Sequence, residues 1–166
     1  MGNKKYIFNK EVAAQKLNRL ALEIAEHLQG DGAELIIIGI KESGIVIAGK
    51  IGLLVQNYLP NQVTIISAEL NKDHPSEVTL SQSIDFTDKN VIVVDDVANS
   101  GKTLLYVMQP LLQYHPKRIQ VLVLVERMHK LFPVKPDYVG LSLATTLQDF
   151  IKVEVKDGEI EGAYIN

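Results

Sequence analysis

The stretch that decides the fold reads Val91-Ile92-Val93-Val94-Asp95-Asp96-Val97-Ala98-Asn99-Ser100-Gly101-Lys102-Thr103. Its first four residues are apolar and β-branched, which is typical of a short strand that is buried on both faces. Two carboxylates, Asp95 and Asp96, follow at the end of this strand, and Ser100-Gly101-Lys102-Thr103 then opens a helix. Because ligands of open parallel sheets bind outside the carboxyl ends of the strands, the run predicts a ligand site here.

The residue types in this run suit a phosphorylated sugar. Backbone N–H groups at a helix start, with small residues that permit close approach, bind a phosphate dianion, and Ala98–Thr103 offers both. The Asp95 and Asp96 carboxylates can accept hydrogen bonds from a diol or approach a hydrated divalent cation. A phosphate cradle beside hydroxyl acceptors matches a ribose 5-phosphate.

The run has two other interpretations. The ending Gly101-Lys102-Thr103 is shared with nucleotide-binding P-loops, but those need a glycine five positions before the final one. That position is Asp96, whose charge would repel phosphate, so the P-loop interpretation fails. The remaining alternative is structural: an acidic strand end followed by a helix that Ser100 caps.

Hydrophobic periodicity divides the rest of the chain into alternating strands and helices. Helical spacing runs over Lys10–Leu28, with Asn9 as its cap, and over Gly44–Tyr58. A third helix is expected over Thr103–Tyr114, kinked at Pro110 because proline lacks a backbone donor. The expected buried strands are Leu35–Ile40, Val63–Ala68, Val91–Val94, Arg118–Val125 and Tyr138–Leu143.

Two segments break this rhythm. Glu69–Lys89 is polar and contains Pro75, and a loop of such length in a compact domain is usually functional or disordered. Near the end, Phe150–Val155 and Gly162–Ile165 flank Asp157-Gly158, which is a hairpin signal. We therefore expect an α/β fold: one domain over residues 1–166, with a parallel sheet flanked by helices and a small irregular C-terminal appendage.

The composition excludes several classes of protein. There are no cysteines, so disulfides, thiolate metal sites and a cysteine nucleophile are absent. The formal net charge is −3, so no global attraction to nucleic acid is expected. No apolar stretch approaches the ~20 residues that a membrane span needs, and the expected location is cytoplasmic. A local basic patch could form only if distant residues meet, and the candidates are Lys4, Lys5, Lys117, Arg118 and Lys130.

The run around Asp95 and Asp96 resembles the signature for 5-phosphoribosyl 1-pyrophosphate (PRPP) in type I phosphoribosyltransferases. The closest likeness is to the bifunctional pyrimidine-operon attenuator/uracil phosphoribosyltransferases, from about residue 15 to the end. The segments that carry it are Ile38–Gly44, Ile84–Thr103, Leu124–His129 and Pro136–Gly140. The resemblance implies the type I fold, transfer of ribose 5-phosphate from PRPP to a nucleobase with release of pyrophosphate, Mg²⁺ as cofactor, and a homodimer.

The resemblance also implies roles for individual residues. The implied PRPP-binding residues are Lys41, Glu42, Ser43, Gly44, Asp95, Asp96, Val97, Ala98, Asn99, Ser100, Gly101, Lys102 and Thr103. Within this set, Lys41–Gly44 is the pyrophosphate loop, and Asp95 and Asp96 meet the ribose hydroxyls and the hydrated Mg²⁺. The implied catalytic residues are Asp95, Asp96, Asn99 and Lys72, the last on a flexible hood over Glu69–Phe86. The implied base-binding residues are Glu126, Arg127 and Phe150.

Several of these roles have ordinary alternatives. Lys41 could be a solvated lysine at a strand end, and the hood could simply be disordered. Glu126 and Arg127 could form a surface ion pair of little energetic value. Phe150 could belong to the core, and Asn99 could shape its loop by tolerating an unusual backbone conformation.

The sequence also departs from the family pattern. The attenuator pattern Lys-Thr-Arg-Gly reads Lys41-Glu42-Ser43-Gly44 here, so a cation is lost and a carboxylate is gained beside a polyanion. The hood pattern Tyr-Arg-Asp reads Asn71-Lys72-Asp73, and Lys102 replaces an arginine without its bidentate geometry. Hypoxanthine-guanine enzymes carry aspartate at Asn99 and lysine at Glu126, so a 6-oxopurine is disfavoured. Glu126 resembles the aspartate of the uracil-type pattern, so uracil is preferred.

Three functions follow for the same pocket. The first is an active uracil-type phosphoribosyltransferase. The second is an RNA-binding pyrimidine-operon attenuator, and the third is a non-catalytic sensor of PRPP or nucleotides, which Ser43 and Asn99 favour.

Overall fold

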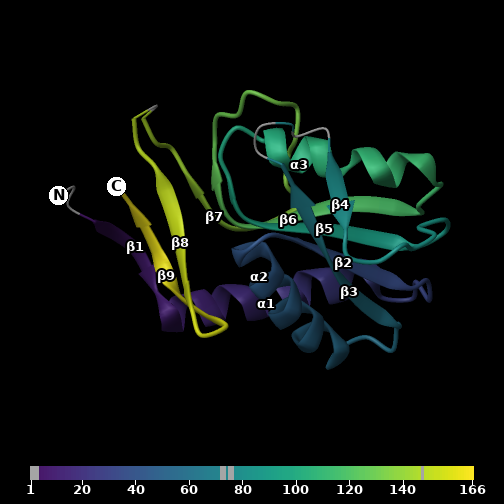
Figure 1. The fold of residues 1–166 in the computed structure, drawn as a ribbon. Coiled ribbons are helices and arrows are strands. Elements are labelled where there is room, and N and C mark those ends of the chain that lie inside the picture. The colour runs from purple at the N-terminus through teal and green to yellow at the C-terminus, as the bar shows by residue number, and fades with distance from the viewer. Residues whose placement is uncertain (1–3, 72–73, 75–76, 147) are drawn as a thin grey trace.

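A six-stranded sheet forms the body of the computed structural model, which describes residues 4–71, 74, 77–146 and 148–166. Its strand order is β4-β3-β2-β5-β6-β7, and a three-stranded sheet of order β1-β9-β8 stands beside it (Figure 1). The elements are β1 Lys5–Asn9, α1 Lys10–Leu28, β2 Leu35–Ile40, α2 Ser43–Gln56, β3 Val63–Leu70, β4 Val78–Leu80, β5 Asn90–Ala98, α3 Lys102–Val107, the 3₁₀ helix η1 Gln109–Gln113, β6 Arg118–Arg127, β7 Tyr138–Leu143, β8 Ile151–Lys156 and β9 Glu159–Ile165. No helix in this part of the chain is long and apolar enough to span a membrane.

The first helix, α1, has the bounds that the sequence predicts. The Asn9 side chain accepts a hydrogen bond from the Val12 backbone N–H at 3.0 Å, so it satisfies one of the free donors of the first turn. One face of α1 is buried, and it consists of Ala13, Leu17, Leu20, Ala21, Ile24 and Leu28. The cap and the apolar period therefore determine this helix locally.

The central strands β2 and β5 run parallel and pair Ile36 with Val91 and Ile37 with Ile92. Their side chains alternate between the two faces of the sheet, as a period of two requires. Ile37 and Ile92 belong to the core under α1 and α2, whereas Ile36 and Val91 belong to the core under α3. Both faces are buried, which confirms the interpretation of these runs as buried strands.

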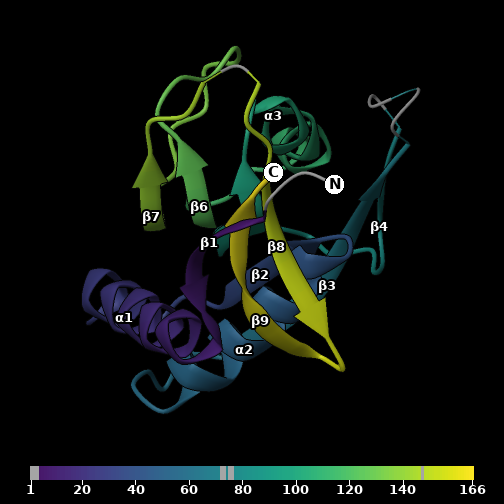
Figure 2. The same cartoon turned by 90° about the vertical axis from the view of Figure 1, so that its left-hand side faces the viewer.

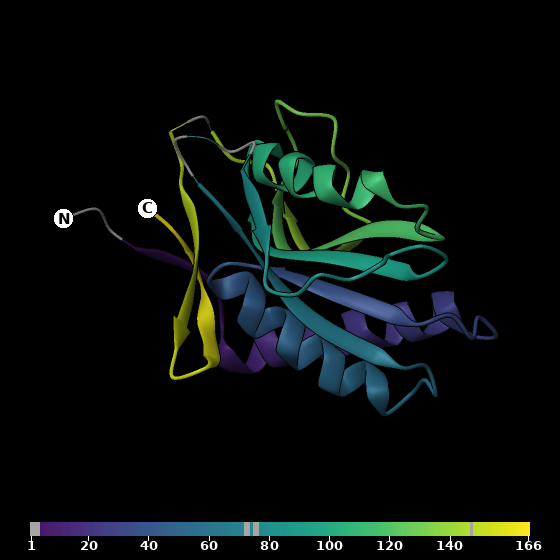
Figure 3. The same ribbon diagram turned by 45° about the vertical axis from the view of Figure 1, so that its right-hand side comes forward.

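The layers follow from this alternation. The helices α1 and α2 cover one face of the six-stranded sheet, and α3 with η1 covers the other (Figure 2; Figure 3). The strands β3, β2, β5, β6 and β7 run parallel to one another, so the α/β fold with a sheet flanked by helices is confirmed. The sheet is mixed rather than purely parallel, because β4 pairs antiparallel with β3 at its edge.

The expected long loop over Glu69–Lys89 is wrong in part. Strand β3 continues to Leu70 and pairs with β4, with Glu69 opposite Thr79. The other end of the segment is anchored, because Phe86 is 1% exposed and packs edge-on against Tyr114 with ring centroids 5.5 Å apart. The alternation at Val78 and Leu80 was the signal for β4, but three residues are too few to outweigh polar neighbours.

The expected helix over Thr103–Tyr114 is also wrong. Helix α3 ends at Val107, and η1 follows with Pro110 in its first turn. A proline nitrogen has no hydrogen to donate, so the α-helical ladder stops before Pro110 instead of kinking through it. The result is an α3 of only six residues.

The C-terminal segment is a regular sheet, not the irregular appendage that the sequence suggested. Asp157 and Gly158 have φ of 50° and 73°, as the turn between β8 and β9 requires. Strand β1 then pairs antiparallel with β9, with Lys5 opposite Ile165. The polar N-terminal stretch gave no signal for β1, because pairing with the other end of the chain creates this strand.

Gly39 lies where β2 meets the start of α2. A Cβ added there would lie 2.6 Å from Ile45 Cα and 2.7 Å from the Gly44 carbonyl oxygen, both backbone atoms that cannot swing away. We therefore expect Gly39→Ala to lower stability by about 1–3 kcal/mol, a fall of about 2–4 °C in Tm for each kcal/mol at this chain length. Thermal unfolding followed by circular dichroism measures this effect.

Gly49 in the middle of α2 is the matched control, because a Cβ added there meets nothing within 4 Å. Gly49→Ala should raise stability by about 1 kcal/mol, as expected for a helix interior. If both variants change Tm by the same amount and in the same direction, close packing against Gly44 and Ile45 is not the reason that position 39 is a glycine.

Candidate functional site

The site lies at the carboxyl end of β5, at the point where strand order reverses. The ladder between β2 and β5 ends at Gly39 and Val94, whereas the ladder between β5 and β6 continues to Ala98 and Glu126. The helices that follow β2 and β5 cover opposite faces of the sheet (Figure 2). A crevice opens at such a switch point, and Asp95 and Asp96 are the residues that reach it.

The two carboxylates are oriented by their own backbone. Asp95 Oδ1 accepts from the Asp96 N–H at 2.8 Å, and Asp96 Oδ1 accepts from the Val97 N–H at 2.7 Å. Burial, followed by the neighbouring Asp96 charge, raises the pKa of Asp95 well above its ordinary value. A cation or a set of hydroxyl donors beside Asp95 would lower its pKa again, because both stabilise the ionised carboxylate.

A small cavity of about 80 Å³ lies over the loop that follows, and Asp95, Asn99, Ser100, Lys102 and Thr103 are among its lining residues. The loop is tied down on its outer side, since the Ser100 carbonyl accepts from Leu131 N and Phe132 N at 3.0 Å each. Gly101 has φ of 85°, in the left-handed region that favours glycine. The loop therefore forms a cradle of the size that a single phosphate group needs.

A larger cavity of about 690 Å³ adjoins the cradle and is bordered by Lys41, Glu42, Asp95, Lys102 and Thr103 among others. Lys41 forms an ion pair with Glu69 at 3.5 Å, and both side chains are exposed. Such a pair has little energetic value, so Lys41 can exchange Glu69 for an anionic ligand. This is where the structure brings the predicted pyrophosphate loop beside the cradle.

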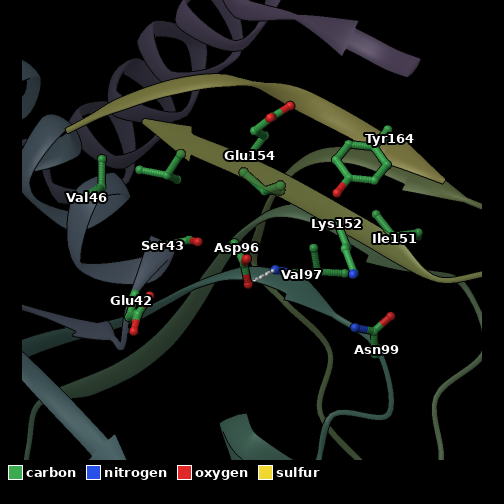
Figure 4. A pocket seen from close by; sticks show the side chains of 12 residues that line it. Glu42, Ser43, Val46, Asp96, Val97, Asn99, Ile151, Lys152, Glu154 and Tyr164 are labelled. Atoms are coloured by element: carbon green, nitrogen blue, oxygen red, sulfur yellow. Dashed lines mark hydrogen bonds between the residues drawn. The ribbon is translucent and has the colours of Figure 1, made fainter. Parts of the chain in front are cut away.

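A third cavity, of about 500 Å³, separates the end of β5 from the β8–β9 hairpin. Figure 4 shows Asp96 and Asn99 on one side and Lys152, Glu154 and Tyr164 on the other. The sequence predicted the hairpin but not its place over β5, so these three hairpin residues were missed. No local signal marks them, because strand periodicity does not say which sheet a hairpin faces.

The predicted base-binding residues do not all meet. Arg127 and Phe150 line a cavity of about 520 Å³ together with Asn99. Arg127 Nε donates to Thr145 Oγ1 at 2.8 Å. Phe150 is 61% exposed, so the alternative that it belongs to the core is wrong.

Glu126 is already engaged on both oxygens. It pairs with Lys130 Nζ at 3.0 Å and accepts from Ser142 Oγ at 2.7 Å, and both ion-pair side chains are largely buried. The alternative of a surface pair between Glu126 and Arg127 is therefore wrong. Lys72, predicted on the hood, lies outside the residues that the structure describes.

Comparison with known proteins decides the family. The profile of the phosphoribosyl transferase domain matches residues 5–156. The chain belongs to this family. The "Bifunctional protein PyrR" of Clostridium acetobutylicum is 32% identical over 167 residues, 94% of this chain and 93% of that protein. The protein of the same name from Bacillus subtilis is 29% identical over 181 residues, 100% of this chain and 99% of that protein.

Solved phosphoribosyltransferases share the fold. The hypoxanthine phosphoribosyltransferase of Trypanosoma cruzi superposes with a TM-score of 0.79 at 16% identity, covering 95% of each chain. A hypoxanthine-guanine phosphoribosyltransferase from Bacillus anthracis gives 0.74 at 22% identity, covering 98% of this chain and 99% of that one. The resemblance inferred from Asp95–Thr103 is thus confirmed: the chain is a phosphoribosyltransferase with the type I fold.

The donor set of this phosphoribosyltransferase suits a cation that the substrate helps to hold. Within the described residues there is no group of three or more His, Cys, Asp or Glu that could hold a metal ion. Asp95 and Asp96 supply two carboxylates, and Mg²⁺ typically binds one or two carboxylates, water and substrate phosphates. These residues therefore fit Mg²⁺ delivered with a phosphorylated substrate.

Asn99 lines the cradle, the cavity of about 500 Å³ under the β8–β9 hairpin, and the cavity of about 520 Å³ that Arg127 and Phe150 border. Its Oδ1 is buried and has no hydrogen-bond partner within the described chain. In that part of the molecule the non-glycine residues with positive φ are Asp88 and Asp157. The alternative that Asn99 serves an unusual backbone conformation is therefore wrong, and its place on the walls of three cavities is compatible with a role toward a ligand.

Proposed function

We propose that this chain transfers ribose 5-phosphate from PRPP to a nucleobase, with uracil preferred, and releases pyrophosphate. The observation that carries the proposal is that three features lie side by side at one sheet edge. These are a carboxylate pair (Asp95, Asp96), a phosphate-sized cradle (Ala98–Thr103) and a cavity bordered by two lysines (Lys41, Lys102). PRPP has the matching groups: a diol, a 5′-phosphate and a pyrophosphate.

In this assignment each group of the chain has one task. Asp95 and Asp96 accept from the ribose hydroxyls and would hold hydrated Mg²⁺, which when bound would neutralise charge on the pyrophosphate leaving group. The backbone donors of Ala98–Thr103 orient the 5′-phosphate, because the pinned Ser100 carbonyl keeps the loop in place. Lys41 and Lys102 attract the pyrophosphate, and the hood over Glu69–Phe86, with Lys72, would exclude water from the reacting carbon.

The departures from the family pattern set the expected rate. Glu42 is exposed and borders the pyrophosphate cavity, so it repels the polyanion that Lys41 attracts. Slow turnover follows from that opposition. Uracil is proposed over a 6-oxopurine because Asn99 is an amide, which does not accept a proton from a purine as the aspartate of hypoxanthine-guanine enzymes would.

The RNA-binding alternative has less support from the structure. Lys117 and Arg118 lie at the start of β6, and Lys130 follows its end. Ten residues of strand separate these ends by roughly 30 Å. Lys117 and Lys130 are also paired with Asp31 and Glu126, respectively.

The homodimer that the family resemblance implies stays a prediction.

A pyrophosphate-release assay with PRPP, Mg²⁺ and a panel of nucleobases tests the proposal. Release should require all three components and should be faster with uracil than with hypoxanthine. PRPP binding without release for any base would instead establish a non-catalytic sensor. RNA binding that falls steeply with salt, without release, would establish the attenuator.

A further inference from the structure

Lys152 on β8 lines the cavity of about 500 Å³ between β5 and the hairpin. It is the only cation among the described residues that line this cavity. Figure 4 shows its ammonium directed from β8 toward the end of β5, on the side of Asn99. The charge therefore lines the same cavity as Asn99, the residue that has the unused acceptor.

The Lys152 ammonium is available to a ligand. It takes part in none of the ion pairs found within the described chain, whereas several other lysines of the fold are paired. Lys50 pairs with Glu159 at 2.9 Å and Lys130 with Glu126 at 3.0 Å. Lys152 is exposed, so its ammonium is reachable from solvent, and its direction toward the cavity is the informative observation.

The rest of the lining decides what kind of group Lys152 meets. Three carboxylates, Glu42, Asp96 and Glu154, border the cavity and would repel a phosphate. The remaining walls are mostly apolar, with aliphatic side chains and the Tyr164 ring. A flat, neutral ring with a hydrogen-bond acceptor on its edge satisfies both properties.

We propose that Lys152 selects the base: its ammonium donates to an exocyclic oxygen of an oxo-substituted ring and disfavours an amino group there. An ammonium has three donors and no acceptor, so it pairs with a carbonyl oxygen but leaves an amino group facing another donor. A site that loses a charged hydrogen bond in this way discriminates by about tenfold or more. This inference rests on the proposed function, and it places the base in the cavity that Lys152 lines instead of the cavity that Arg127 and Phe150 line; Asn99 borders both cavities.

Three ligands that share one sugar phosphate test the inference. Uridine 5′-monophosphate and cytidine 5′-monophosphate differ in an oxygen against an amino group, and ribose 5-phosphate lacks the base. Calorimetric titration of the full chain with Mg²⁺ should show wild type binding the uridine nucleotide about tenfold more tightly than the cytidine nucleotide. Lys152→Met, of similar length, should bring that ratio close to one and leave ribose 5-phosphate affinity unchanged.

Two further variants make the test specific. Lys152→Arg keeps a donor-only side chain and should restore most of the preference for the oxo base. Lys156→Met removes a cation from the exposed end of the same strand and should change none of the three affinities.

Each failure has its own signature. Equal wild-type affinity for the two nucleotides, with normal binding of PRPP, would overturn the role of Lys152 and leave the proposed function standing. An equal loss for all three ligands in Lys152→Met would place the ammonium on the phosphate and also overturn it. Wild type that binds neither PRPP nor ribose 5-phosphate would overturn the proposed function, and the role of Lys152 with it.

Discussion

Replacing Asp95 and Asp96 together by asparagine is expected to weaken PRPP binding by about 10²–10⁴-fold. Hydrogen bonds to a charged group contribute about 1.5–3 kcal/mol each, and two carboxylates facing the ribose and Mg²⁺ lose about twice that. Each 1.4 kcal/mol is about tenfold in affinity. Titration calorimetry with PRPP and Mg²⁺ measures the loss.

The matched control removes two negative charges far from the site. Glu11 and Glu26 are exposed on α1, and the double change to glutamine should leave PRPP affinity unchanged. Charge alone predicts tighter binding of a polyanion when two carboxylates are lost, so the sign of the effect identifies direct contact. Unchanged affinity in the Asp95→Asn, Asp96→Asn variant would refute the assigned role.

The effect of the Asp95→Asn change on the fold can be checked separately through the pH dependence of stability. Burial raises the pKa of Asp95 above its ordinary value of 3.8, so the unfolded chain gives up this proton at lower pH than the folded one. The contribution of Asp95 to stability is therefore complete below pH 3.8 and is lost as pH rises through the folded-state pKa. Asp95→Asn should be more stable than wild type at neutral pH without ligand. Lower stability there would mean that the binding loss reflects damage to the fold.

Asn99→Asp is expected to accelerate transfer to hypoxanthine by about 10²–10⁴-fold, the usual contribution of a well-placed general base. An amide does not take a proton near neutral pH, whereas a carboxylate does. The Asn99 oxygen is buried without a partner, and burial would raise the pKa of a carboxyl group there toward the working pH. PRPP affinity should change little, because the backbone donors of the cradle stay in place.

Single-turnover rates with hypoxanthine and with uracil across pH measure this effect. Asn99→Leu is the control, since it fills similar volume and offers no proton acceptor; its rate should not exceed that of wild type. Identical pH–rate profiles for wild type and Asn99→Asp would contradict a role for this position in proton transfer.

Local rules were enough for much of the fold. The cap at Asn9, the apolar period of α1 and the turn at Asp157-Gly158 depend on neighbours within a few residues, and all three appear as expected. The order of apolar strand, carboxylate pair and small-residue loop identified the family before any contact was known. The prediction for Glu69–Lys89 was wrong in part because a strand as short as β4 gives too weak a pattern to recognise. The prediction for Thr103–Tyr114 was wrong because Pro110 ends the α-helical hydrogen bonding.

Taken alone, the sequence determined the alternation of strands and helices and the chemistry of Asp95–Thr103, because both depend on residue type and short spacing. Tertiary structure alone decided which distant groups share the site. Strand β1 exists because Lys5 meets Ile165. Glu126 is not free to bind a ligand, because its carboxylate oxygens already contact Lys130 and Ser142. Lys152 faces β5 because the hairpin packs over the sheet edge. Contacts between residues far apart in the chain depend on the packing of whole elements, and no local period of the sequence encodes them.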